Sequence, residues 1–214
     1  MSARPRRAAE QAYALEARGA SARLRRLALE ALNLAAGIGL LYLGARARIA
    51  APFSPVPFTL QTFALNLLVL VHGRRAIAHV ASYIAMGLAG LPVFAYGGGP
   101  AYVLSPTFGY VAGFLAGTAA AARIAPRGAL STRRALAAGL AQLLVIYALG
   151  ASWLAAWRLL FLGGSLAGAL ATALAAGVAP FVAWDLAKLA AALGLARALV
   201  VARMRVASRI ARRS

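Results

Sequence analysis

The chain alternates long apolar blocks with short basic clusters, and this alternation is its dominant pattern. A helix needs about 20 mostly apolar residues to cross a hydrocarbon core of about 30 Å, so each long block predicts a membrane span. A helical connector and a short apolar piece near 165–178 are expected before the last span. The pattern predicts an all-α membrane protein of about six transmembrane helices, at about 27–43, 59–71, 76–91, 107–122, 135–153 and 180–201.

Two segments between the blocks cannot be regular helix. Residues 51–58 carry three prolines, which fix φ and remove backbone donors, and residues 91–106 are rich in Gly and Pro. Neither segment carries a charge, and irregular backbone at membrane depth is tolerated only where it is buried in protein or lines a cavity. The pattern favours a lid over a pocket that opens outward. The alternative is a pair of interfacial loops anchored by Phe94, Tyr96 and Tyr102.

The distribution of charge predicts the orientation of the chain. The 214 residues are 63% hydrophobic, and 22 Arg and one Lys against four acids give a net charge of +19. A nucleic-acid-binding protein can have this balance too, but here the Arg clusters cap apolar blocks, which favours membrane topology. With six spans and the N-terminus inside, 19 Arg fall inside and three fall outside, at 46, 48 and 158. Both termini are therefore expected to be cytoplasmic, because positive residues prefer that side.

Asp185 and Lys188 are the only Asp and the only Lys of the chain, and both lie inside the last apolar block. At i, i+3 they share one helix face and can pair. Ionisable residues within a membrane span are costly and by default indicate a functional site. A carboxylate accepts from N–H groups and an ammonium donates to carbonyl or carboxylate oxygens, so the pair suits a cyclic urea or an amide. A purely structural ion pair and a proton relay are the alternatives.

Catalytic motifs are missing from the sequence. It has no Cys, no phosphate-binding G-x-x-x-x-G-K-[ST] loop and no G-x-S-x-G turn. His72 and His79 lack the H-E-x-x-H setting of a zinc metalloprotease. We therefore expect no enzyme activity, no cofactor and no metal site.

Three segments form a specific set in chain order: VPFTLQTFALNLL (56–68), GLAGLPVFAYGGGPAYVLSPTFGYVAGF (87–114) and DLAK (185–188). This set resembles the BioY family, the biotin-binding S-components of energy-coupling-factor (ECF) transporters, and the similarity runs from about residue 30 to residue 200. Two departures are SPTFGY, where the family favours GPTGGY, and AWDLAK, where a small Pro-Gly element often precedes the Asp. Neither departure removes a polar ligand.

The resemblance implies the S-component fold and a high-affinity subunit that captures biotin in an outward-facing pocket. For Gln61, a contact with the ligand and a helix–helix hydrogen bond worth about 0.6 kcal/mol are equal alternatives. For Tyr83, the alternative to a contact with the ligand is an ordinary packed aromatic. An S-component for another vitamin, or with less support a membrane-embedded enzyme, is the alternative for the whole chain. The residues that the resemblance places against biotin are Asp185 and Lys188, then Gln61 and Tyr83 as polar candidates, and Phe58, Phe94 and Tyr96 as walls.

Small residues on the first span, Ala31 and Ala35, resemble the face on which S-components dock to their coupling subunit, although such spacing is common by chance in an Ala-rich sequence. The implied partners are biotin, membrane lipid, an ECF coupling subunit and two ATPase subunits, with no nucleic acid. We expect a multi-pass protein of a prokaryotic cell membrane. Its expected parts are an Arg-rich cytoplasmic segment (1–26), a six-helix substrate-binding domain (27–206) and a basic cytoplasmic tail (207–214).

Overall fold

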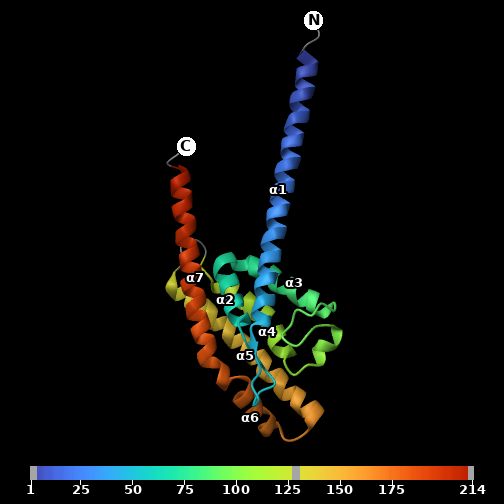
Figure 1. Cartoon of the computed structure of the whole chain (residues 1–214), viewed down its shortest axis with the longest axis vertical. Coiled ribbons are helices and arrows are strands. Elements are labelled where there is room, and N and C mark those ends of the chain that lie inside the picture. The colour runs from blue at the N-terminus through green and yellow to red at the C-terminus, as the bar shows by residue number, and fades with distance from the viewer. Residues whose placement is uncertain (1–3, 127–130, 212–214) are drawn as a thin grey trace. The chain divides into compact units, whose positions relative to one another are not determined.

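Seven α-helices make up most of residues 4–126 and 131–211, the parts of the chain that the computed structural model describes (Figure 1). The chain forms two units, residues 1–36 and residues 37–214. The first unit is helical from Arg4 onward, and the second contains all of the elements that surround the site. The helices are α1 (Arg4–Arg46), α2 (Gln61–His72), α3 (Ala76–Leu88), α4 (Phe108–Ile124), α5 (Thr132–Leu162), α6 (Leu166–Gly177) and α7 (Ala179–Ala211).

The helices occupy the predicted positions but differ in length. Among the described residues, three stretches are long and apolar enough to cross a membrane: Gly19–Arg46, Thr132–Leu162 and Leu166–Ala202. The helix α4 is a shorter apolar helix of 17 residues. The second and third predicted spans are the short helices α2 and α3, of 12 and 13 residues. At about 1.5 Å per residue they extend only about 18–20 Å.

Two helix ends differ from the prediction for identifiable reasons. The third span was expected to reach residue 91, but α3 ends at Leu88, because Gly90 adopts a φ of +114° that stops the helix. The fifth span was expected to end near residue 153 and to be followed by a separate helical connector, but α5 continues through both without a break to Leu162. Arg158 interrupts the apolar run there without interrupting the helix, because arginine is a good helix former.

A short hairpin joins α1 to α2. Its strands, β1 (Arg48–Ile49) and β2 (Phe58–Thr59), pair antiparallel with Arg48 opposite Thr59. Leu60 N donates to Gly44 O at 3.0 Å, and a Cβ at Gly44 would lie only 3.1 Å from the Leu60 carbonyl carbon, so this close approach suits glycine. The hairpin fixes the start of α2 against the end of α1, which matters for the site below.

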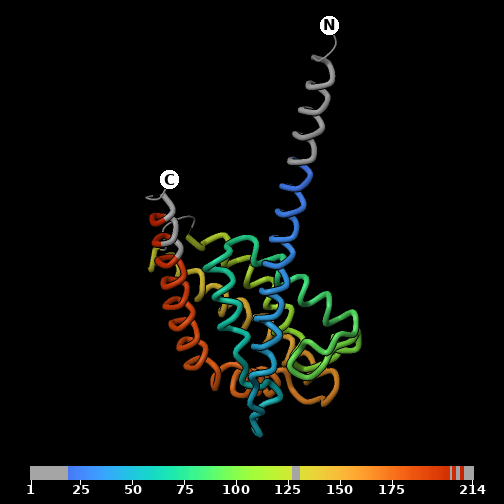
Figure 2. The backbone as a smooth tube through the Cα atoms, turned by 45° about the horizontal axis from the view of Figure 1, so that its top comes forward, coloured from blue at the N-terminus to red at the C-terminus, as the bar shows by residue number. Residues whose placement is uncertain are grey.

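The helices of residues 37–214 pack through small residues. A Cβ at Gly113 of α4 would lie 2.9 Å from Ile146 Cα of α5, and a Cβ at Gly117 would lie 2.8 Å from Gln142 O, so the two backbones approach closely. α2 packs along α7, and the two helices lie side by side in both views (Figures 1 and 2). Most of α2 is buried, which makes it the central helix of this unit.

Within residues 37–214, two basic clusters lie toward the same end of the helices. The α2–α3 turn (η1, Gly73–Arg75) and the C-terminal part of α7 lie toward one end, whereas the hairpin and α6 lie toward the other (Figure 1). Arg74 and Arg75 therefore share an end with the basic C-terminal part of α7. This arrangement agrees with the side that the positive-inside pattern assigns to both clusters.

Candidate functional site

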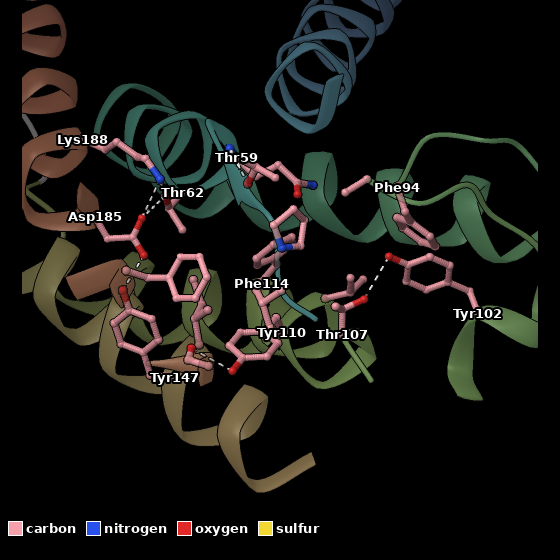
Figure 3. A pocket seen from close by; sticks show the side chains of 18 residues that line it. Thr59, Thr62, Phe94, Tyr102, Thr107, Tyr110, Phe114, Tyr147, Asp185 and Lys188 are labelled. Atoms are coloured by element: carbon pink, nitrogen blue, oxygen red, sulfur yellow. Dashed lines mark hydrogen bonds and ion pairs between the residues drawn. The ribbon is translucent and has the colours of Figure 1, made fainter. Parts of the chain in front are cut away.

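A cavity lies between α2, α4, α5 and α7 and the segments 51–58 and 91–107 (Figure 3). It holds about 610 Å³ of unfilled space, a volume that includes the open space at its mouth. Most of its wall is apolar or aromatic, and the charged groups gather at one end. Its lining side chains include Val56, Phe94, Tyr102, Thr107, Tyr110, Phe114, Ile146, Tyr147 and Phe181, with Gln61, Thr62, Asp185 and Lys188 among the polar ones.

Asp185 is the centre of the polar end. This residue is 4% exposed, and three groups from three helices donate to its carboxylate. Thr62 Oγ1 of α2 donates to Oδ1 at 2.7 Å, and Tyr147 OH of α5 donates to Oδ2 at 2.5 Å. Lys188 Nζ donates to Oδ1 at 2.8 Å (Figure 3). Because a carboxylate offers about four acceptor positions, capacity for one further donor remains.

Lys188 completes the cluster from one turn along α7. Its side chain is 13% exposed, and Nζ also donates to Thr62 Oγ1 at 3.3 Å. An ammonium has three donors, so one is left for a ligand once Asp185 and Thr62 are satisfied. The predicted i, i+3 pair is confirmed as an ion pair at 2.8 Å, and it lines the cavity. The cluster is close to neutral, because the single carboxylate and the single ammonium offset each other.

Tyrosine and threonine hydroxyls supply the remaining polar atoms of the wall. Tyr110 OH donates to Gly177 O at 2.9 Å, which joins α4 to the end of α6. Tyr102 OH lies 3.1 Å from Thr107 Oγ1 (Figure 3). Burial raises the pKa of Tyr102, and the Thr107 hydrogen bond opposes this only in part, so the phenol stays neutral around pH 7. These hydroxyls are therefore held as neutral hydrogen-bonding groups.

Of the predicted polar candidates, Gln61 lines the cavity and Tyr83 does not. Gln61 Nε2 donates to Tyr83 OH at 2.9 Å, and Tyr83 OH donates to Val93 O at 2.7 Å. Tyr83 is fully buried against Phe94, with ring centroids 5.6 Å apart. The structure thus places Tyr83 behind the wall, where it fixes Gln61 and the segment that carries Phe94.

The predicted aromatic walls divide in the same way. Phe94 is fully buried and lines the cavity. Phe58 instead lines a neighbouring groove, and its ring lies 4.5 Å from that of Phe181, which does line the cavity. Tyr96 is 47% exposed and packs under Arg48, outside the cavity wall. The predicted contact of these three residues with a ligand stays a prediction.

The predicted docking residues, Ala31 and Ala35, belong to the helical unit 1–36 and are exposed there. Their role in partner docking stays a prediction. The predicted cytoplasmic tail, 207–214, lies partly outside the described residues, which end at 211.

Sequence reasoning missed Thr62, Tyr147, Tyr110 and Thr107. Thr62 directly follows Gln61, and Tyr147 lies midway along a long apolar helix, where a hydroxyl needs a partner. A tyrosine hydroxyl in an apolar helix was therefore the sequence feature that could have identified Tyr147 as a polar site residue. Nothing in the spacing along one helix says that Thr62 and Tyr147 meet the same carboxylate, because this depends on how α2, α5 and α7 pack.

The two irregular segments contribute directly to the cavity. Val56 comes from the first of them, and Phe94 and Tyr102 come from the second. The second segment is fastened to α5, because Trp153 Nε1 donates to Ser105 O at 2.8 Å and Trp157 Nε1 donates to Leu104 O at 2.7 Å. This wall position agrees with the predicted lid better than with loops that only rest at the interface.

The BioY family profile matches residues 17–205. The chain is 42% identical over 104 residues to a protein named biotin transporter BioY from Thermotoga maritima. This match covers 48% of this chain and 61% of that protein. It is 39% identical over 108 residues to a probable biotin transporter BioY from Lysinibacillus sphaericus. This match covers 50% of this chain and 55% of that protein. These matches thus span only about three-fifths of the length of the curated relatives.

A solved structure shares the fold. It is the crystal structure of the S-component for biotin from an ECF-type ABC transporter, with a TM-score of 0.61 at 23% identity over 84% of this chain and 92% of that chain. The predicted all-α S-component fold is therefore confirmed. With the long apolar helices and the family match, the chain is a multi-pass prokaryotic membrane protein.

Proposed function

The chain belongs to the BioY family, and on this premise we propose that it is the biotin-binding subunit of an uptake transporter. The observation that carries the proposal is the cluster of Asp185, Lys188, Thr62 and Tyr147 at one end of an otherwise apolar cavity. Intramembrane charges by default indicate a functional site, and these two line the cavity instead of packing away from it. Transport, and not catalysis, is the activity that the family assignment supports.

Biotin matches the two chemistries of the cavity. Its bicyclic ring system presents N–H donors and a carbonyl acceptor on the ureido edge, and its remaining ring atoms and aliphatic chain are apolar. The free acceptor position on Asp185 suits a ureido N–H, and the third Lys188 donor suits a ureido oxygen. Phe94, Phe114 and Phe181 would pack against the apolar atoms. Gln61 gives one amide hydrogen to Tyr83, and its second amide hydrogen and its carbonyl oxygen remain for a ligand.

Release of biotin into the cell needs more than this chain. A pocket that holds its ligand in one state must be weakened in another, and a ligand shifts such an equilibrium only by its differential affinity. We infer that an ECF coupling subunit with two ATPase subunits drives that change. Docking on the face of Ala31 and Ala35, and a cytoplasmic position for residues 1–26, form part of the same proposal.

Titration calorimetry on the detergent-purified chain tests the proposal, with wild type beside Asp185→Asn. We expect tight biotin binding by wild type and at least a tenfold loss in the variant, because an amide cannot replace the carboxylate as acceptor for these donors. Glu30→Gln is the matched control, since Glu30 is an exposed acid paired with Arg26. It should bind as wild type does.

Each other outcome has a defined meaning. A folded wild type that does not bind biotin would overturn the biotin assignment, and binding of a different vitamin would then identify a related S-component. Biotin binding that survives Asp185→Asn would keep the ligand but reduce the Asp185–Lys188 pair to a structural one.

A further inference from the structure

A second hollow adjoins the cavity on the side of the hairpin. It lies between the end of α1, the strands β1 and β2, and α7, and holds about 1100 Å³ of unfilled space, counting the open volume. We call it the basic groove, because three cations line it: Arg46, Arg48 and Lys188. Its remaining wall is mainly apolar and includes Phe58 and the exposed Trp184.

The basic groove and the cavity share a wall. Thr59 and Lys188 line both hollows. Next to them, Phe58 from the groove meets Phe181 from the cavity, with ring centroids 4.5 Å apart. The groove and the proposed biotin site therefore share lining residues and adjoin each other.

The two arginines of the basic groove pair with no acid whose side chain the structure describes. Among those side chains, the only ion pairs are Arg26–Glu30 and Lys188–Asp185. Arg46 donates to Pro92 O at 2.5 Å and lies over Tyr42, while Arg48 lies over Tyr96 with 5.0 Å from Cζ to the ring centroid. A carbonyl and two ring faces orient these guanidinium groups without neutralising them. Both side chains belong to exposed residues, so their field reaches the solvent.

We propose that the basic groove is the encounter site for the carboxylate of the substrate. Arg46 and Arg48 attract the anion, and the substrate then passes into the cavity across the boundary formed by Thr59 and Lys188. This inference rests on the proposed function, because it takes biotin, a carboxylate, as the substrate. A cationic surface raises the association rate of an anionic ligand by about 10–10³-fold, and the effect falls steeply with ionic strength. The groove therefore acts on association, and the cluster around Asp185 acts on retention.

Arg48 is the better position for a test, because Arg46 also holds the Pro92 carbonyl. The experiment measures the association and dissociation rate constants of biotin by stopped-flow tryptophan fluorescence in a neutral detergent. Three variants are compared with wild type: Arg48→Gln, Arg48→Lys, and Arg158→Gln as the matched control. Arg158 lies on α5 and lines neither hollow, so its substitution removes the same net charge elsewhere. The carboxamide of biotin serves as an uncharged probe.

For Arg48→Gln we expect an association rate constant about three- to tenfold lower at ~0.01 M salt, where the Debye length is about 30 Å. The difference should vanish at ~1 M salt, where that length is about 3 Å. The dissociation rate constant should stay within about twofold of wild type. Arg48→Lys should restore fast association, and neither Arg158→Gln nor the carboxamide should show the effect.

Three results would overturn the inference while leaving the proposed function intact. The first is biotin binding at an unchanged rate in Arg48→Gln. The second is an equal slowing for biotin and its carboxamide, which would indicate a change of shape instead of charge. The third is faster association, as expected if an anionic phospholipid occupied the groove and Arg48 held it there. A wild type that binds neither probe would instead refute the proposed function, and this inference with it.

Discussion

Thr62→Val isolates the hydroxyl that links both charges of the site. Thr62 Oγ1 donates to Asp185 Oδ1 at 2.7 Å and accepts from Lys188 Nζ at 3.3 Å. Valine has nearly the same shape, so the substitution removes the two hydrogen bonds without opening a cavity. Asp185 is 4% exposed, and water does not readily replace the lost donor at such a site.

The expected loss of stability in Thr62→Val follows from these contacts. A hydrogen bond to a charged group contributes about 1.5–3 kcal/mol. The 2.7 Å bond to Asp185 accounts for most of it, because the 3.3 Å bond from Lys188 is long and Lys188 keeps its own bond to Asp185. We expect the free energy of unfolding to fall by about 1.5–3 kcal/mol. At about 2–4 °C per kcal/mol for a chain of this size, Tm should fall by about 3–12 °C.

Thermal unfolding in detergent, followed by tryptophan fluorescence, measures this shift. Thr172→Val is the matched control, because the Thr172 hydroxyl only donates to Gly168 O within α6. Its Tm should stay within about 2 °C of wild type, as expected for a site outside the core. A Thr62→Val protein with the Tm of this control would refute the reasoning, since it would mean that Thr62 contributes nothing to holding the buried pair.

Two further substitutions test the packing of the helices and the fastening of the wall. Gly113→Val should lower the free energy of unfolding by about 1–3 kcal/mol, because its Cβ would meet the Ile146 backbone at 2.9 Å. Gly39→Ala, inside α1 with no neighbour within 4 Å, should leave it unchanged or raise it by up to about 1 kcal/mol in the same denaturation assay. Trp153→Phe removes the donor to Ser105 O, a hydrogen bond worth about 0.5–1.5 kcal/mol, so biotin should dissociate about two- to tenfold faster in a stopped-flow chase. An unchanged dissociation rate would mean that this bond does not hold the wall closed.

The residues that sequence reasoning located best are the rare ones. Asp185 and Lys188 stand out because an apolar span makes any charge conspicuous, and their i, i+3 spacing was enough to predict the ion pair. The helices themselves were also predictable, because length and apolar content determine them. Their ends were less so, since Arg158 looked like a boundary in the hydropathy pattern although it lies inside α5.

The partners of the predicted pair were not predictable. Thr62 and Tyr147 come from α2 and α5, and their approach to Asp185 depends on the rotation of each helix about its axis. In a chain that is apolar on nearly all faces, helical periodicity does not define that rotation. Tyr83 shows the converse, because a tyrosine predicted as a polar contact of the ligand lies behind the cavity wall, where its hydroxyl accepts from Gln61. Which face of an aromatic meets the ligand is decided by packing between elements.

The short helix α3 has a consequence for the surrounding bilayer. Its 13 residues extend about 20 Å, whereas the hydrocarbon core is about 30 Å thick. A helix shorter than the hydrocarbon core is accommodated by local thinning of the bilayer, at fractions of a kcal/mol per Å of mismatch, because tilting would shorten its reach further. The elastic energy stored on this side therefore depends on acyl-chain length. Short-chain lipids, which form a thinner bilayer, relieve this strain.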